Sequence, residues 1–179
     1  MNGSDIPGCL VLEPQVFGDA RGFFLESFNQ KRFADLVGRE VTFVQDNRSG
    51  SVKNVLRGLH YQVGTPQAKL VWATAGAVFD VAVDLRPDSP TFGRWAGLEL
   101  SAANKKQLWL PEGLAHGFLA LSDWAEISYK VSAYYAPNAE RTLLWNDPTV
   151  GVAWPLPPGV APLLSAKDRQ GRPLAAGLV

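Results

Sequence analysis

The chain has 179 residues, a length that suits one domain rather than two. Hydrophobic residues make up 46% of it and charged residues 19%, a composition typical of a globular protein and not of a disordered one. Its 17 Lys and Arg residues balance its 17 Asp and Glu residues, which excludes the strongly basic surface of a general binder of nucleic acid or of an anionic membrane.

Two further features of the sequence bear on where the protein works. Cys9 is the only cysteine, so the chain forms neither an internal disulfide nor a cysteine-rich zinc site, and a reducing compartment suits it. The N-terminus lacks a basic segment followed by an apolar run, and no stretch approaches the roughly 18 apolar residues of a membrane span. We therefore expect a cytoplasmic protein with no membrane partner and no nucleic-acid partner.

In chain order, the first predicted element is a helix at residues 29–37. Asn29 can cap its N-terminus and Gly38 can end it, while Phe33 and Leu36 recur at helical spacing. Short apolar segments with alternating side chains follow, separated by turn residues, and such segments are typical of strands. The predicted strands cover residues 41–45, 55–62, 69–73, 77–85, 95–100, 107–110, 126–131 and 142–145.

The last part of the chain differs in composition, because five of the 13 prolines fall after residue 150. We expect one domain over residues 1–179, with an irregular, proline-rich C-terminal arm from about residue 151 and a short helical turn at residues 165–170. Regular helices do not alternate with the predicted strands, which disfavours a doubly wound sheet or a (β/α)8 barrel. The predicted fold class is mostly β, as a sandwich, jelly roll or barrel with few short helices.

The sequence lacks the motifs of several large enzyme classes, namely the glycine-rich dinucleotide and phosphate loops, the GxSxG nucleophile elbow and the HExxH zinc motif. A metal-dependent jelly roll brings several His and carboxylate ligands together, yet this chain has two histidines, His60 and His116, in distant segments. We therefore expect no metal ion.

His60 lies in a strand-like run, residues 54–62. Strict alternation places it on one face with Gly58 and Gln62, so it is either a half-exposed strand histidine or a functional one. Arg57 then points to the opposite face, and only a bulge or bend near Gly58 would bring both side chains into one pocket.

Four other residues each allow two interpretations. His116 is followed by a glycine, with another three residues before it, and these glycines allow either close approach to a ligand or a tight turn. Asp80 and Asp84 alternate with apolar residues, so they indicate a site if they face inward and a solvated surface if they face outward. Lys69 begins an apolar strand, where its ammonium either stabilises an oxyanion or extends to solvent.

Two groups of tyrosines have different expected surroundings. Tyr129 alternates with Ile127 and Val131, so core packing is its default role. Tyr134 and Tyr135 adjoin a Pro-Asn turn, where exposed rings can stack on a ligand.

Several runs taken together resemble one family. They are FGDARGFF at residues 17–24, QDN at 45–47, VLRGLHYQ at 55–62, LPEGLAHGF at 110–118 and SAKD at 165–168. In this order they resemble the dTDP-4-dehydrorhamnose 3,5-epimerase family, and the resemblance extends over roughly residues 8 to 170.

This resemblance implies a cupin-type jelly roll that works as a homodimer without a cofactor, on a dTDP-4-dehydro-6-deoxy sugar. It assigns the general base to His60 and the carboxylate that orients it to Asp168. Lys69 stabilises the enolate oxygen, and Tyr129 is the proton donor, with Tyr134 as a weaker candidate. A histidine paired with a carboxylate suits this chemistry because the carboxylate fixes the ring tautomer and raises its basicity.

The same resemblance implies the residues that bind the substrate, chiefly its nucleotide and diphosphate. They are Arg21, Glu26, Gln45, Asp46, Asn47, Arg57, His116, Tyr135, Glu140 and Lys167. Arg and Lys suit a diphosphate on a neutral protein because a few charge-assisted hydrogen bonds replace net charge.

The resemblance leads to a specific reaction and leaves alternatives open. The reaction is inversion at C3 and C5 of dTDP-4-dehydro-6-deoxy-D-glucose, by removal of a proton and its return to the opposite face. A single-centre epimerase would share His60, Asp168 and Lys69, and Tyr129 favours the double reaction. A metal-dependent cupin and a non-catalytic sugar-nucleotide-binding jelly roll are the alternatives of other classes.

Overall fold

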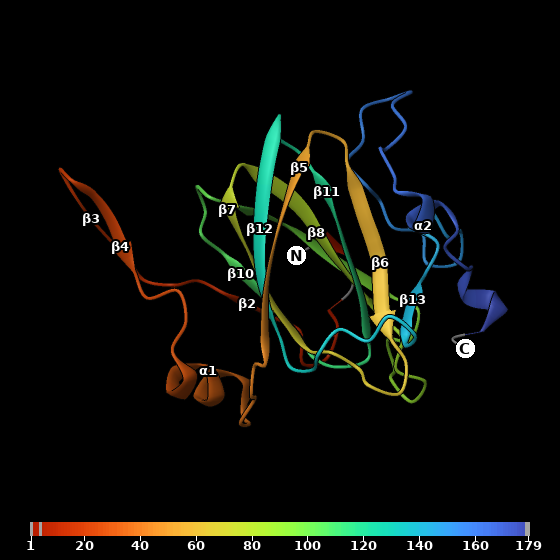
Figure 1. The fold of residues 1–179 in the computed structure, drawn as a ribbon, viewed down its shortest axis with the longest axis horizontal. Coiled ribbons are helices and arrows are strands. Elements are labelled where there is room, and N and C mark those ends of the chain that lie inside the picture. The colour runs from red at the N-terminus through yellow and green to blue at the C-terminus, as the bar shows by residue number, and fades with distance from the viewer. Residues whose placement is uncertain (1, 4, 178–179) are drawn as a thin grey trace.

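The structure, a computed structural model, describes residues 2–3 and 5–177 and is built around two antiparallel sheets (Figure 1). The six-stranded sheet has the order β1 (Asn2–Gly3), β9 (Trp95–Ser101), β8 (Ala77–Asp84), β11 (Leu114–Ala120), β6 (Leu56–Gln62) and β13 (Glu140–Thr142). The five-stranded sheet has the order β2 (Leu10–Leu12), β10 (Gln107–Leu110), β7 (Lys69–Ala75), β12 (Trp124–Val131) and β5 (Gln45–Val52).

Side chains along a strand point alternately to the two faces of its sheet, so each strand contributes to two apolar layers. On β8, Val78 and Ala82 pack between the two sheets, whereas Phe79, Val81 and Val83 pack on the outer face against the C-terminal segment. The predicted mostly β jelly roll is confirmed, because two sheets with this alternation bury one common core.

Helix α1 (Gln30–Val37) covers the outer face of the five-stranded sheet, where Phe33 packs against Trp109. The side chain of Asn29 accepts a hydrogen bond from the backbone N–H of Arg32, and Gly38 ends the helix with φ 74°. The predicted helix and both of its capping residues are therefore confirmed.

Some predicted strands are displaced or missing. Residues 41–44 are not a strand, and the strand that follows them is β5, Gln45–Val52. Residues 142–145 overlap β13 at Thr142 alone. The sequence pattern did not predict β11, β2 or the hairpin of β3 (Val16–Asp19) and β4 (Gly22–Leu25).

The hairpin β3–β4 projects away from both sheets (Figure 1). Its aromatic side chains are largely exposed, at 55% for Phe17, 63% for Phe23 and 68% for Phe24. Exposed apolar surface gathered on a projecting element is typical of a contact with another chain.

The C-terminal segment lies on the opposite side of the molecule, along β6 and β13 (Figure 1). It contains α2 (Ala166–Arg169) and the short 3-10 helix η1 (Leu174–Ala176), and it is otherwise largely irregular. Ser165 caps α2 by accepting a hydrogen bond from the backbone N–H of Asp168, which confirms the predicted helical turn.

Candidate active site

A cavity of about 200 Å³ opens between the two sheets. One wall comes from β6 and β13 of the six-stranded sheet, and the other from β5, β7 and β12 of the five-stranded sheet. The lining residues are Gln45, Asn47, His60, Tyr61, Gln62, Gln67, Lys69, Leu114, Tyr129, Tyr135 and Glu140.

A β-bulge in β6 shapes one wall of the cavity. β6 pairs with β11 at His60 and His116, and again at Arg57 and Phe118. Three steps along β6, from 57 to 60, therefore match two steps along β11, from 116 to 118. Gly58 and Leu59 therefore lie opposite Gly117 alone, and two residues facing one is the pairing of a β-bulge.

The bulge decides which way Arg57 and His60 point. Leu56 and Leu59 pack together on the outer face of the sheet, so Arg57 and His60 both face the space between the sheets. Arg57 donates a hydrogen bond from Nε to the hydroxyl oxygen of Ser51, at 3.0 Å. The bulge expected near Gly58 is present and turns both side chains to one face, but Arg57 does not line the cavity.

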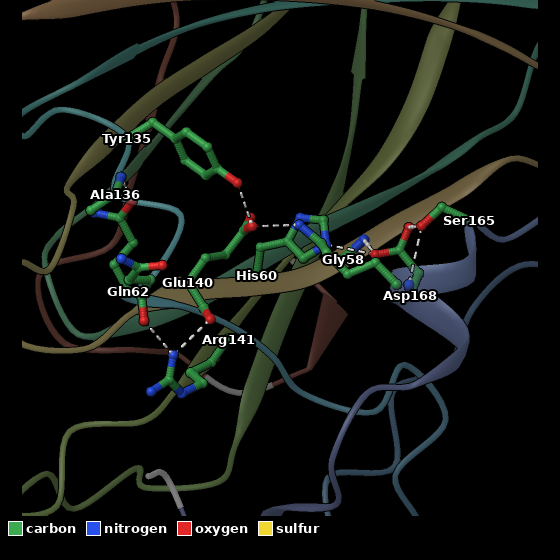
Figure 2. Close-up of polar contacts among 11 residues, drawn as sticks. Gly58, His60, Gln62, Tyr135, Ala136, Glu140, Arg141, Ser165 and Asp168 are labelled. Carbon is green, nitrogen blue, oxygen red and sulfur yellow. Dashed lines mark hydrogen bonds and ion pairs between the residues drawn. The ribbon is translucent and has the colours of Figure 1, made fainter.

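His60 and Asp168 form a close pair, although they are 108 residues apart in the chain (Figure 2). His60 Nε2 lies 2.6 Å from Oδ1 of Asp168, and the Ser165 hydroxyl donates to Oδ2 at 2.7 Å. Burial alone would raise the pKa of Asp168, but hydrogen bonds from His60 and Ser165 hold that pKa below its usual value. A neutral His60 that donates its Nε2 proton to this ionised carboxylate has Nδ1 free to accept a proton.

Lys69 points into the protein and not to solvent. It begins β7, and Val71 and Ala73 on the same face of that strand pack between the sheets. Its burial lowers the pKa of Lys69 to about 8, while the negative charges of Asp80 and Glu140 partly oppose this shift. The alternative of a lysine extended to solvent is therefore wrong.

His116 and Asp80 form a second pair, which is more deeply buried. His116 Nε2 lies 2.9 Å and 3.0 Å from the two carboxylate oxygens of Asp80, and the two residues are 7% and 0% exposed. Asp80 and Asp84 both face inward. Gly117 lies within strand β11, whereas Gly113, with φ 88°, lies in the turn just before that strand, so the tight-turn alternative holds for Gly113. His116 does not line the cavity, but the negative charge of its partner Asp80 acts on Lys69.

Tyr129 lies on β12 and lines the wall opposite His60. Burial raises the pKa of its phenol, so the hydroxyl keeps its proton at neutral pH. Tyr134 is 70% exposed and does not line the cavity. Of the two tyrosines, the geometry places Tyr129 at the site.

Glu140 connects two other predicted binding residues (Figure 2). Its Oε2 accepts a hydrogen bond from the Tyr135 hydroxyl at 2.8 Å and pairs with Nζ of Lys167 at 2.7 Å. Burial alone would raise the pKa of Glu140, but the bonds from Lys167 and Tyr135 keep it below its usual value. The cavity rim therefore has a fixed anion next to a cation and an exposed aromatic ring.

The three predicted binding residues of β5 do not share one face. Gln45 and Asn47 line the cavity, and Nε2 of Gln45 donates to Oδ1 of Asn47 at 2.7 Å. The side chain of Asp46 points the other way and pairs with Nζ of Lys130 at 3.0 Å. Alternation along the strand thus removes the Asp46 side chain from the cavity.

Arg21 and Glu26 are distant from the cavity of their own chain. Arg21 follows β3 in the projecting hairpin, where it pairs with Asp19 and its side chain is 90% exposed. Glu26 pairs with Arg32 of α1 at 3.1 Å. Neither residue lines the cavity, so one chain by itself does not bring them to the site.

Several lining residues were not predicted from the sequence, among them Gln62, Gln67 and Leu114. Gln62 could have been found, because it shares a strand face with His60. It donates to the backbone carbonyl of Thr65 and accepts from the backbone N–H of Ala136, so it holds the rim in place. Gln67 lies in a loop, where no periodic sequence pattern indicates which way its side chain points.

The described part of the chain was also searched for metal-binding clusters and for membrane-spanning helices. In residues 2–3 and 5–177, no three His, Cys, Asp or Glu side chains gather as metal ligands would. In the same part of the chain, no helix is long and apolar enough to cross a membrane.

The model of the dTDP-4-dehydrorhamnose 3,5-epimerase family matches residues 3–176 of the chain. The chain belongs to this family. Curated relatives of that name are 60% identical over 164 residues in Salmonella typhimurium, covering 91% of this chain and 88% of the relative, and 58% identical over 170 residues in Pseudomonas aeruginosa, covering 95% and 93%.

Solved structures agree with this family membership. The 3,5-epimerase RmlC from Legionella pneumophila, in complex with dTDP-4-keto-L-rhamnose, is 49% identical with a TM-score of 0.92, covering 96% of this chain and 90% of that one. ChmJ from Streptomyces bikiniensis, a 3'-monoepimerase in complex with dTDP-quinovose, is 37% identical with a TM-score of 0.89, covering 98% and 88%. The family fold therefore accommodates both double and single epimerisation.

Proposed function

We propose that the chain inverts C3 and C5 of dTDP-4-dehydro-6-deoxy-D-glucose to give dTDP-4-dehydro-L-rhamnose, without a cofactor. Inversion needs a base on one face of the sugar and an acid on the other. His60 on β6 and Tyr129 on β12 come from opposite sheets and face one cavity, and this arrangement is the observation that carries the proposal.

In the proposed reaction, His60 removes the proton from carbon next to the C4 ketone, and Asp168 stabilises the resulting imidazolium. Negative charge then develops on the C4 oxygen, where the ammonium of Lys69 stabilises the enolate. Tyr129 returns a proton to the opposite face of the carbon. General acid–base catalysis contributes about 10² to 10⁴ in rate, and electrostatic stabilisation of the enolate adds to it.

The proposed nucleotide contacts follow from what the cavity rim offers. Tyr135 presents a ring for stacking on the base, and its hydroxyl is fixed by Glu140. Arg57 and Lys167 are cations for the diphosphate. Amide side chains from β5 add neutral hydrogen-bonding groups, which suit a sugar or a base.

We also propose a homodimer of single-domain chains, in the cytoplasm, in which the hairpin β3–β4 reaches the partner's site. The hairpin exposes three phenylalanines and carries Arg21, which is distant from its own cavity. A homodimer with twofold symmetry would bring two such hairpins to two cavities at once. Arg21 and Glu26 would then bind the nucleotide held by the partner.

The test is proton NMR of the substrate in deuterated water, with the product trapped by a reductase. Exchange of the protons at C3 and C5, with inversion at both carbons, is expected for the wild-type protein. His60→Asn should abolish exchange at both carbons and still bind dTDP. Exchange at one carbon would make the protein a single-centre epimerase, and unchanged exchange in the His60→Asn variant would reject His60 as the base.

A further inference from the structure

Asp168 reaches His60 from a part of the chain that has little structure of its own. α2 has four residues and follows a largely irregular stretch. A helix this short does not persist without tertiary support. The position of the Asp168 carboxylate therefore depends on how the chain is attached before and after α2.

Backbone hydrogen bonds attach the segment on both sides of α2. Before the helix, Leu163 donates to the carbonyl of Asn54 at 2.8 Å and accepts from the N–H of Leu56 at 3.0 Å. After the helix, Arg172 donates to the carbonyl of Thr142 at 2.9 Å. These partners lie at the start of β6 and at the end of β13, the strands that carry His60 and Glu140.

Asp147 provides a third attachment, beyond α2. Its Oδ1 accepts hydrogen bonds from the backbone N–H groups of Thr149, at 2.7 Å, and Val150, at 3.1 Å. Its Oδ2 accepts from the backbone N–H of Leu174 at 2.7 Å. The carboxylate thus joins the turn after β13 to the chain just beyond α2.

The environment of Asp147 fits a buried, ionised anchor. Asp147 is 1% exposed, and burial alone would raise its pKa, but the hydrogen bonds from Leu174, Val150 and Thr149 lower it. The Leu174 side chain packs in the same apolar cluster as Leu59, on the outer face of β6. Anchoring Leu174 therefore holds the segment against the strand that carries His60.

We infer that Asp147 is a positioning residue for catalysis, which holds the returning C-terminal segment so that Asp168 stays in hydrogen-bond contact with His60. Asp147 does not line the cavity, so it acts through the pair and not on the substrate. The inference rests on the proposed role of His60 as base. It uses a hydrogen bond that can be observed without turnover, so its failure is separable from failure of the proposed function.

Two pairs of variants isolate the hydrogen bond between Asp147 and Leu174. Asp147→Asn keeps the shape but leaves one accepting oxygen in place of two, so it loses either the bond from Leu174 or the bonds from Thr149 and Val150. Leu174→Pro removes that N–H, and it fits the backbone because Pro173 has ψ 150° and residue 174 begins a helical turn. Leu174→Ala keeps the N–H and Val150→Ala keeps the carboxylate, so these two control for lost packing.

The measurement is the far-downfield proton NMR signal of each His–Asp hydrogen bond, at low temperature with dTDP bound. The chain has two histidines, and His60→Asn and His116→Asn assign the two signals. The bond between His116 and Asp80 joins β11 to β8 on the inner face of the sheet, opposite the face that packs against the C-terminal segment, and serves as an internal control.

Asp147→Asn and Leu174→Pro should each broaden or abolish the His60 signal, keep the His116 signal and lower kcat by about 10- to 100-fold, the effect of misplacing a catalytic group. Leu174→Ala and Val150→Ala should lower the melting temperature and keep both signals. A His60 signal that persists in both test variants would overturn the inference. Equal loss of both signals would also overturn it, because the effect would then be general unfolding.

Discussion

At the scale of single residues, Lys69 combines two requirements that oppose each other. A cation at the site stabilises an enolate most strongly where water is excluded, yet the same burial disfavours the charge. Here burial lowers the pKa of Lys69 to about 8, and the negative charges of Asp80 and Glu140 oppose the shift. The lysine is therefore charged at neutral pH and loses its proton in a mildly alkaline medium.

This pKa predicts an alkaline limit to activity. As pH rises through about 8, Lys69 becomes neutral, and kcat should fall because the enolate loses its cation. Lys69→Arg should be slower at neutral pH but lack the alkaline limit, since arginine stays charged. The check is the rate of carbon–proton exchange from pH 6 to about 10, and a Lys69→Arg variant that keeps the alkaline limit would assign it to another group.

We also expect that the buried charge of Lys69 lowers the stability of the fold while it supports activity. The folded-state pKa of about 8 lies below the ordinary value of 10.5, so the unfolded chain binds more protons between these two pH values. The free energy of unfolding should therefore rise with pH across this window. Lys69→Met removes the buried charge and should raise that free energy at pH 7 by on the order of 2 kcal/mol, while kcat falls. Urea unfolding of the wild type and of Lys69→Met at pH 7 and pH 10 measures the pH dependence and the effect of the substitution on the free energy of unfolding. A variant less stable than the wild type at pH 7 would contradict the expected sign.

At the scale of elements, the bulge of β6 requires a glycine at position 58. This residue has φ 115°, and a Cβ there would lie 2.6 Å from the Cα of Gly117 and 2.7 Å from the carbonyl oxygen of His116. Gly58→Ala should lower the free energy of unfolding by about 2 kcal/mol or more and abolish activity, because Arg57 and His60 lose their common face.

The matched control for Gly58 is Gly64, which also has a positive φ, 74°, but whose Cβ would meet no atom within 4 Å. Gly64→Ala should cost about 1 kcal/mol through backbone strain alone. Thermal unfolding and the exchange assay compare the two variants. Equal losses at both glycines would mean that the contact with Gly117 is unimportant.

Elements were predictable where a periodic apolar pattern meets a core on one face. β10 was found with its full bounds and β8 nearly so, and helix α1 was marked by its capping residues. β5 was missed because its sequence, QDNRSGSV, has polar side chains on both faces. One face lines the polar cavity and the other is exposed to solvent. Neither face needs apolar side chains, so the strand lacks the alternating apolar pattern. β11 is buried on both faces and therefore shows no alternation.

At the scale of the whole molecule, the candidate site joins residues that no local pattern connects. Alternation predicted that Asp80 and His60 each lie on a particular strand face, but their partners are 36 and 108 residues away. Pairing across such separations depends on sheet order and on the path of the C-terminal segment. The resemblance to the family supplied the pair of His60 and Asp168, whereas the pair of His116 and Asp80 came from the structure alone.

Whole-molecule geometry also separates Arg21 from His60 within one chain, and this leads to the last prediction. If the hairpin reaches the partner's cavity, each site combines His60 of one chain with Arg21 of the other. Homodimers of His60→Asn and of Arg21→Ala should both be impaired when substrate is below KM. A mixed dimer of these two variants would contain one site with both changes and one site with neither.

Co-expression of the two variants should therefore restore activity. Random pairing makes about half of the dimers mixed, with one intact site each, so about a quarter of all sites should have wild-type activity. Two tags, purified in sequence, isolate the mixed dimer, which should reach about half of the wild-type rate per dimer with substrate below KM, because one of its two sites is intact. If Arg21 instead serves the site of its own chain, every site in the mixed dimer carries one change, and no activity beyond that of the parent variants returns.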